Sequence, residues 1–261
     1  MSIYSDSIKN EEQAMNQAEK DIRTQLAACY RIFDYMGWSE LIYNHITVKV
    51  PGEEGHFLIN PYGLHYKEVT ASNLVKVDIN GSIVEDTNYA VNPAGMLIHS
   101  AIHGAREDAH CIGHIHSTAG MTVACQQEGL RIDNFYSVLL YNKIAYHDFQ
   151  GITVMDGEKE DLLKSLGDKQ FLILRSHGLL TTGGTIADMF MNMTLLQRAC
   201  EIQVSVDQTG KAVAPVDESI GQMTEKLLEL QMANTPVANG QLEFAALQRL
   251  VDREDDSYRD L

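Results

Sequence analysis

The pattern of apolar and polar positions predicts a chain in which helices alternate with short strands. Apolar residues recur at helical spacing from Glu19 to Met36, and Gly37 then supplies a helix stop. A second helix is expected from Asn92-Pro93 to about residue 105, because Asn is a favoured N-cap and Pro a favoured first helical residue. Similar patterns predict further helices near residues 118–127, 158–166, 185–208, 218–233 and 240–252.

Alternating apolar positions and turn dipeptides predict two hairpins in the first third of the chain. Residues 44–50 and 56–59 flank Pro51-Gly52, and residues 75–79 and 82–85 flank Asn80-Gly81. Later apolar runs predict strands at residues 111–116, 138–146, 151–154 and 171–175, whereas residues 176–178 and 181–185 are interpreted as turns. Helices mixed with partly antiparallel strands favour one layered α/β domain.

Three segments are predicted from the changes in composition along the chain. Residues 1–18 are polar, and we expect them to be frayed ahead of a domain covering residues 19–210. Gly210 ends the longest predicted helix, and residues 211–261 then read as a linker followed by a helical appendage.

Charge and cysteine usage exclude several classes of protein. The chain has 20 Lys and Arg against 36 Asp and Glu, a formal charge of −16, which argues against nucleic-acid binding because phosphates require a basic surface. No run approaches the roughly 20 apolar residues of a membrane span, and the N-terminus lacks the pattern of a signal peptide. Four scattered cysteines without a Cys-x-x-Cys pair are typical of reduced thiols, so we expect a cytoplasmic protein.

Three histidines are candidate metal ligands. His114 and His116 lie two residues apart in a predicted strand, where their side chains share one face, and His177 lies in a turn after another strand. Three protein nitrogens with one open position are typical of a catalytic metal site. Spacing alone leaves two interpretations open, a metal site or ordinary buried histidines.

His99 and His103 form a second candidate pair, four residues apart on one face of a predicted helix. No Glu follows His99, so the zinc-protease helix motif is absent, and we interpret the pair as packing residues or as supports for metal ligands. The chain also lacks the Gly-x-Gly-x-x-Gly, P-loop and Gly-x-Ser-x-Gly motifs.

Five motifs together resemble the class II aldolase/adducin family, and within it the adducin head domain most closely. They are Gly-Trp-Ser-Glu-Leu-Ile-Tyr-Asn-His-Ile-Thr (37–47), Asn-Pro-Ala-Gly (92–95), His-Ile-His-Ser-Thr-Ala-Gly (114–120), Ala-Tyr-His-Asp (145–148) and Leu-Arg-Ser-His-Gly-Leu (174–179). Residues 242–252 also resemble the segment that follows the head domain in adducins.

The resemblance implies a three-layer α/β/α fold with a central mixed, largely antiparallel sheet, and a homotetramer with sites at subunit boundaries. It also implies a small-molecule substrate and a divalent metal held by His114, His116 and His177. Zinc is the metal expected first, with Fe²⁺ and Mn²⁺ as alternatives. Asn44 and Gly63 match substrate-binding positions in the family's two phosphate segments.

The chain departs from the family's sugar-phosphate aldolases at the position of their catalytic acid. Those enzymes place a Glu four residues before the histidine that matches His99, and here that position is Gly95. Pro93 and Ala94 replace two hydroxyl residues that help to bind phosphate, and residues 41–43 replace a glycine-rich loop. General acid–base catalysis typically contributes about 10²–10⁴-fold, so standard sugar-phosphate aldolase activity is not expected.

No residue is assigned as the catalytic acid or base from the sequence. Tyr136 lies near the place where some relatives supply a tyrosine from a neighbouring subunit, and a packed or interfacial tyrosine is the alternative interpretation.

Two functional hypotheses follow from these matches and departures. The first is a metal-dependent enzyme acting on a small carbonyl or hydroxy-acid substrate by aldol-type or enolate chemistry. The second is a non-catalytic, adducin-like oligomerisation or interaction module. The acidic end of the sequence differs from the basic tail through which adducins engage actin and membranes, so cytoskeletal and membrane binding are not expected.

Overall fold

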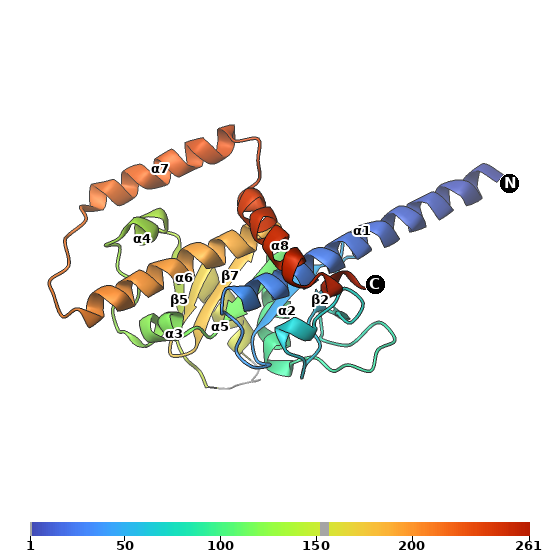
Figure 1. Ribbon diagram of the computed structural model, residues 1–261, viewed down its shortest axis with the longest axis horizontal. Coiled ribbons are helices and arrows are strands. Elements are labelled where there is room, and N and C mark those ends of the chain that lie inside the picture. The colour runs from blue at the N-terminus through green and yellow to red at the C-terminus, as the bar shows by residue number, and fades with distance from the viewer. Residues whose placement is uncertain (1, 152–156) are drawn as a thin grey trace.

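A seven-stranded mixed sheet forms the centre of the computed structural model, which describes residues 2–151 and 157–261 (Figure 1). The strand order is β3-β2-β1-β4-β7-β6-β5, and β5 and β6 form the only parallel pair within these residues. The strands are β1 (His45–Lys49), β2 (His56–Ile59), β3 (Val75–Asp78), β4 (Cys111–Ile115), β5 (Ile144–His147), β6 (Phe171–Leu174) and β7 (Gly178–Gly183). The predicted mixed, largely antiparallel sheet is therefore confirmed.

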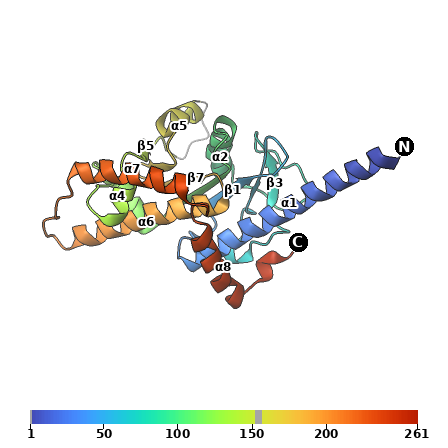
Figure 2. The same cartoon turned by 90° about the horizontal axis from the view of Figure 1, so that it is seen from above.

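Helices cover both faces of the sheet and complete the predicted three layers (Figure 2). The helices are α1 (Ser2–Tyr35), α2 (Pro93–Ala105), α3 (Thr118–Cys125), α4 (Phe135–Leu139), α5 (Glu158–Leu166), α6 (Ile186–Gln208), α7 (Glu218–Asn234) and α8 (Gln241–Glu254), with short 3₁₀ turns at Tyr66–Glu68 and Ser257–Arg259. The main core joins α1, α3, α6 and α8 to one face of the sheet, and a smaller core joins α2 and α5 to the other.

Alternation along β4 decides which side chains face each layer. Cys111 and Ile115 belong to the main core, whereas Ile112 belongs to the core under α2 and α5. His114 shares the parity of Ile112 and therefore faces the α2 side. On the neighbouring strand β1, Ile46 and Val48 enter the main core. The residues that alternate with them, His45 and Thr47, therefore face α2.

Two predicted helix starts are confirmed by their hydrogen bonds. The side chain of Asn92 accepts from the backbone N–H of Ala94 ahead of Pro93, as expected for the N-cap of α2. Thr185 caps α6 by accepting from the N–H of Asp188. The helices expected near residues 118–127, 158–166, 218–233 and 240–252 are also present.

Other expected elements are wrong or incomplete. α1 begins at Ser2 rather than near residue 19, because residues 2–35 contain no Gly or Pro and are rich in helix-forming Glu, Gln, Lys and Ala. Residues 138–146 do not form one strand: Asn134 caps the short helix α4, and β5 starts only at Ile144. Residues 82–85 contribute a single bridge between Val77 and Ile83, and most of the strand expected at 151–154 lies outside the described residues.

Strand β7 replaces the turn expected at residues 181–185. Its two Gly residues have low strand propensity, but the strand is paired on both sides, with β4 and β6, and all six of its residues are buried. Tertiary pairing therefore overrides the local turn pattern.

The end of the chain packs onto the main body. Phe244 and Val251 of α8 belong to the main core, and the backbone carbonyls of Tyr258 and Asp260 accept from Ala71 and Ser72. The domain boundaries at residues 18 and 210 stay predictions. No helix among the described residues combines the length and apolar character of a bilayer span.

The packing of α8 predicts a large effect of truncating Phe244, which is 6% exposed. Phe244→Ala is expected to lower the free energy of unfolding by about 3–5 kcal/mol, because a large buried side chain leaves a cavity. Leu242→Ala, on the same helix and 66% exposed, is the matched control and should change it by less than about 0.5 kcal/mol. Urea denaturation measures both, and equal effects would show that α8 does not contribute to the core.

Candidate metal centre

Three imidazoles converge where β4 ends and β6 turns into β7. His114 lies in β4, His116 follows the strand directly, and His177 is the last residue of the three-residue turn between β6 and β7. The ligand nitrogens of all three lie within 4.8 Å of one another. The Nε2 atoms of His114 and His116 are 2.7 Å apart. The predicted convergence of these three histidines is therefore confirmed, and the metal itself stays a proposal.

Two backbone features bring the turn histidine to the strand. Ser176 has a left-handed φ of 54°, which reverses the chain immediately before His177. Gly178 leaves the space that β7 needs against β4, because an added Cβ would lie 2.5 Å from the carbonyl oxygen of Ile115 and 3.1 Å from the His116 ring. Geometry thus requires a glycine at position 178.

The tautomer of His114 fits a metal ligand. Its Nδ1 lies 2.9 Å from the carbonyl oxygen of Leu179, which can only accept, so Nδ1 carries the proton and Nε2 presents a lone pair. Burial lowers the pKa of His114 well below its usual value, with the neighbouring imidazoles adding to the effect. Burial also lowers the pKa of His116. Neutral imidazole is the form that binds a cation.

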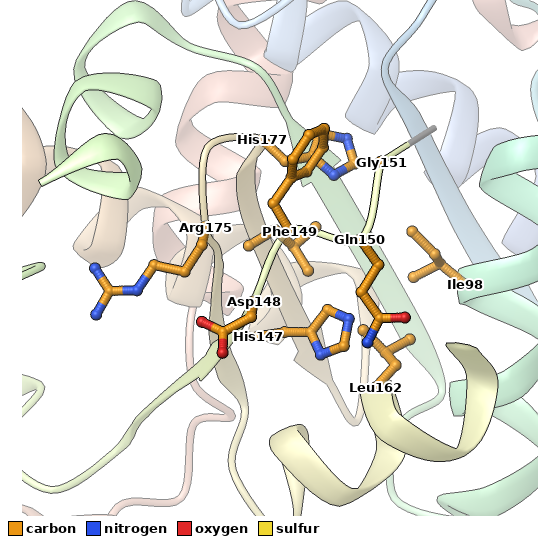
Figure 3. Close-up of a pocket in the computed structure, with 10 residues that line it drawn as sticks. Ile98, His147, Asp148, Phe149, Gln150, Gly151, Leu162, Arg175 and His177 are labelled. Carbon is orange, nitrogen blue, oxygen red and sulfur yellow. The ribbon is translucent and has the colours of Figure 1, made fainter. Parts of the chain in front are cut away.

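Two hollows adjoin the three-histidine cluster, formed by His114, His116 and His177. One, with room for little more than a water molecule, has Phe149 and His177 at one end and His147 and Leu162 at the other (Figure 3). The Phe149 ring is half-exposed, with its centroid 6.5 Å from that of His177. The second hollow, of about 680 Å³, is lined by His116 together with residues 36–40, 117–119, 197 and 201. A small molecule therefore has room beside the cluster on the His116 side.

The predicted substrate-binding residues, Asn44 and Gly63, do not take part in the hydrogen bonds that the cluster's histidines form in the described part of the chain. Asn44 is buried, its Nδ2 donates to the carbonyl of Trp38, and its Oδ1 is buried without a hydrogen-bond partner. Gly63 lies in an exposed loop with a left-handed φ of 100°. No hydrogen bond within the described residues joins Gly63 to Asn44 or to the histidines, so their roles stay predictions. Tyr136 packs against the main core.

His99 and His103 lie behind the cluster, as expected for supporting residues. Both side chains are buried and bond to the hydroxyl of Thr47, with Oγ1 2.7 Å from Nδ1 of His99 and 2.8 Å from Nε2 of His103. Nε2 of His99 lies 3.1 Å from Nδ1 of His45. The ring of His45 lies beside that of His114, with centroids 5.2 Å apart.

His45 is the residue that sequence reasoning missed. It belongs to a motif that carries the family resemblance, but it has no partner at a recognisable spacing in the sequence. The available signal was the spacing of two residues between His45 and Thr47, which places both side chains on one face of β1. Only the pairing of His45 with His114 across β1 and β4 brings it to the cluster.

Comparison with known proteins identifies the family. The model for "Class II Aldolase and Adducin N-terminal domain" matches residues 24–204. A Pseudomonas aeruginosa protein whose name places it among the class 2 aldolases is 43% identical over 245 residues, covering 94% of each chain. Rat alpha-adducin is 42% identical over 252 residues, covering 92% of this chain and 34% of its own.

A solved structure supports the same assignment. The aldolase II superfamily protein from Pseudomonas syringae is 40% identical and superposes with a TM-score of 0.85, covering 93% of this chain and 96% of its own. The chain belongs to the class II aldolase and adducin family.

The buried histidines predict an acid-sensitive fold. Burial lowers the pKa of His103 to about 3, against 6.5 in the unfolded chain, so between these values the unfolded state binds the extra proton. The free energy of unfolding should therefore fall as pH drops below about 6.5, by up to about 1.4 kcal/mol per pH unit for this residue. His103→Gln should flatten that slope between pH 6 and 4. His110→Gln, at an exposed position, is the control: it removes only a minor electrostatic contribution to the pKa of His103 and should change the slope much less. Denaturant titration across this pH range measures it, and equal slopes in all three proteins would contradict the assignment.

Proposed function

We propose that this class II aldolase and adducin family protein is a metal-dependent enzyme that acts on a small carbonyl or hydroxy-acid substrate by aldol-type or enolate chemistry. The observation that carries the proposal is the convergence of His114, His116 and His177, with His114 fixed in the tautomer that presents Nε2. Class II aldolases use a divalent metal, and these three nitrogens are the donor set that this chain offers to one.

Each side chain of the cluster has a definable task. His114, anchored by the Leu179 carbonyl, fixes the position of one ligand nitrogen, while His116 and His177 supply the other two. A divalent cation bound there would supply Lewis-acid stabilisation of negative charge on a substrate oxygen. Three neutral imidazoles leave the charge of such an ion uncompensated, so the site favours an anionic oxygen ligand.

The choice of metal follows from the donor set. Three imidazole nitrogens with an open position suit Zn²⁺, which we propose as the resident ion, with Fe²⁺ and Mn²⁺ as alternatives. The proposed cytoplasmic location agrees with four free cysteines.

We also propose a homotetramer. Exposed apolar side chains at Ile220, Met223, Leu227 and Leu230 share one face of α7, which lies apart from the sheet in Figure 1. Such a face is typical of a surface that another subunit covers. The family's members are typically oligomeric, which supports the same proposal.

Sugar-phosphate aldolase activity of the standard kind does not fit position 95. A Cβ added to Gly95 would lie 2.5 Å from Nε2 of His45, so this position cannot carry a side chain while His45 keeps its place. The substrate is therefore expected to differ from that of the sugar-phosphate aldolases.

The second candidate function is a non-catalytic oligomerisation module of the adducin type. The observation in its favour is the 42% identity to rat alpha-adducin over 92% of this chain. The chain spans about a third of that protein, so the match concerns the head domain alone.

The proposal predicts about one divalent metal ion per chain in the purified protein. The double variant His114→Ala/His116→Ala should lose it, because one remaining imidazole cannot hold the ion. His110→Ala, which removes an exposed histidine, should keep it. Elemental analysis after dialysis measures the stoichiometry. Wild-type protein that neither contains metal nor can be loaded with it would refute the metal site.

Activity separates the enzyme from the interaction module. Metal-loaded protein should turn over at least one member of a panel of hydroxy-aldehydes and hydroxy-acids, and His177→Ala should lower kcat/KM by at least about 100-fold through loss of charge stabilisation. His110→Ala serves again as the control. Complete inactivity of the metal-loaded protein across the panel would favour the adducin-type module.

A further inference from the structure

A buried row of four side chains runs behind the three-histidine cluster. It consists of His103, Thr47, His99 and His45, each at most 5% exposed. Consecutive members are joined by hydrogen bonds of 2.8, 2.7 and 3.1 Å. Its far end is the carbonyl oxygen of Ala109, 2.9 Å from Nδ1 of His103. The row thus connects a fixed backbone acceptor to the side of the cluster.

The Ala109 carbonyl fixes the direction of every bond in the row. A carbonyl only accepts, so Nδ1 of His103 carries the proton and its Nε2 accepts from the Thr47 hydroxyl. The Thr47 oxygen has then used its only proton, so it accepts from Nδ1–H of His99. Nε2 of His99 accepts in turn from Nδ1–H of His45. Burial lowers the pKa of all three imidazoles well below neutrality, which agrees with one proton on each ring.

The row therefore ends on a lone pair at Nε2 of His45. No residue in the described ranges hydrogen-bonds to this atom, although the other ring nitrogen is engaged. His45 pairs with His114 across the two strands, and the two rings lie side by side. Gly95 leaves room for the Nε2 edge, because any side chain at that position would collide with it. An uncommitted acceptor, held in one tautomer, thus lies next to the cluster.

We propose that His45 is a ligand-binding residue whose Nε2 accepts a hydrogen bond from a hydroxyl group of the ligand. The ligand class is a 2-hydroxy acid or 2-hydroxy carbonyl compound, whose carboxylate or carbonyl oxygen is held at the cluster while the adjacent hydroxyl donates to His45. This inference rests on the proposed metal site, and it adds a specificity for hydroxyl donors over ethers. Thr47 is a positioning residue that acts through His99.

The test compares two ligands with the same metal-binding atoms on Co²⁺-loaded protein. Glycolate offers a hydroxyl proton, whereas methoxyacetate carries a methyl group in its place. Their dissociation constants are measured by titration, following the Co²⁺ absorption bands, and the preference for glycolate is compared between variants. Comparing the preference rather than either affinity cancels the intrinsic difference in chelation between the two ligands.

His45→Val should reduce the preference for glycolate by about three- to tenfold, the effect of one net hydrogen bond. Thr47→Val keeps His45 but frees the row to adopt the opposite tautomers, and it should cause a similar loss. Thr47→Ser keeps the hydroxyl and should restore the preference. Thr181→Val removes a buried strand hydroxyl that bonds only to the Met189 carbonyl, so it is the matched control and should behave as wild type.

The outcomes separate this inference from the proposed function. Wild-type protein that binds no Co²⁺ overturns both. Wild-type protein that binds Co²⁺, with a glycolate preference unchanged in His45→Val, overturns the role of His45 and leaves the metal site standing. An unchanged preference in Thr47→Val alone overturns the positioning row. Cooperative thermal unfolding and Co²⁺ stoichiometry of each variant show that the fold is retained.

Discussion

The pairing of β4 between β1 and β7 is the constraint on which the rest of the site depends. It places His114 opposite His45 on one side and opposite Leu180, beside the Leu179 carbonyl, on the other. Strand alternation then sends both histidines to the α2 face, while Cys111 and Ile115 fill the main core. The glycines at 95 and 178 lie at the points of closest approach, where a Cβ would displace an imidazole or the strand backbone. The site is thus a consequence of sheet register rather than of a flexible loop.

Burying this many imidazoles carries a desolvation cost, and the hydrogen bonds show how it is offset. Most ring nitrogens that face the protein have a backbone, hydroxyl or imidazole partner, as with Leu179 for His114, Ala109 for His103 and His45 for His99. Burial lowers the pKa of His103 and His114, so these rings stay neutral. A neutral donor set attracts cations without the opposing charge of a carboxylate, which leaves the charge of a bound ion available to an anionic ligand oxygen.

The layered fold and the choice of the three cluster histidines could be predicted through the family resemblance, and local rules agree with the placement of the histidines. Strand period places His114 and His116 on one face, and the turn at Ser176 places His177. β7 and His45 could not be predicted in this way. The end of β7 looks like a turn because Gly183 and Gly184 follow its threonines, and only the two neighbouring strands fix it as a strand. His45 reaches the cluster only because it pairs with His114, which lies 69 positions further along the chain, and a local sequence pattern cannot predict such a distant contact.

The absence of a side chain at Gly95 and the position of the His45 ring depend on each other, because a Cβ at Gly95 would collide with that ring. In the sugar-phosphate aldolases that the chain resembles, position 95 carries a Glu, and its loss is the strongest argument for a non-catalytic protein. The structure shows that the space above Gly95 is filled by the imidazole of His45, itself oriented by Thr47 and His99. A site that had only lost its acid would not need a buried, fully directed row of hydrogen bonds ending beside the three-histidine cluster. The missing carboxylate therefore indicates a site rebuilt around a neutral acceptor, and it no longer weighs against chemistry at this position.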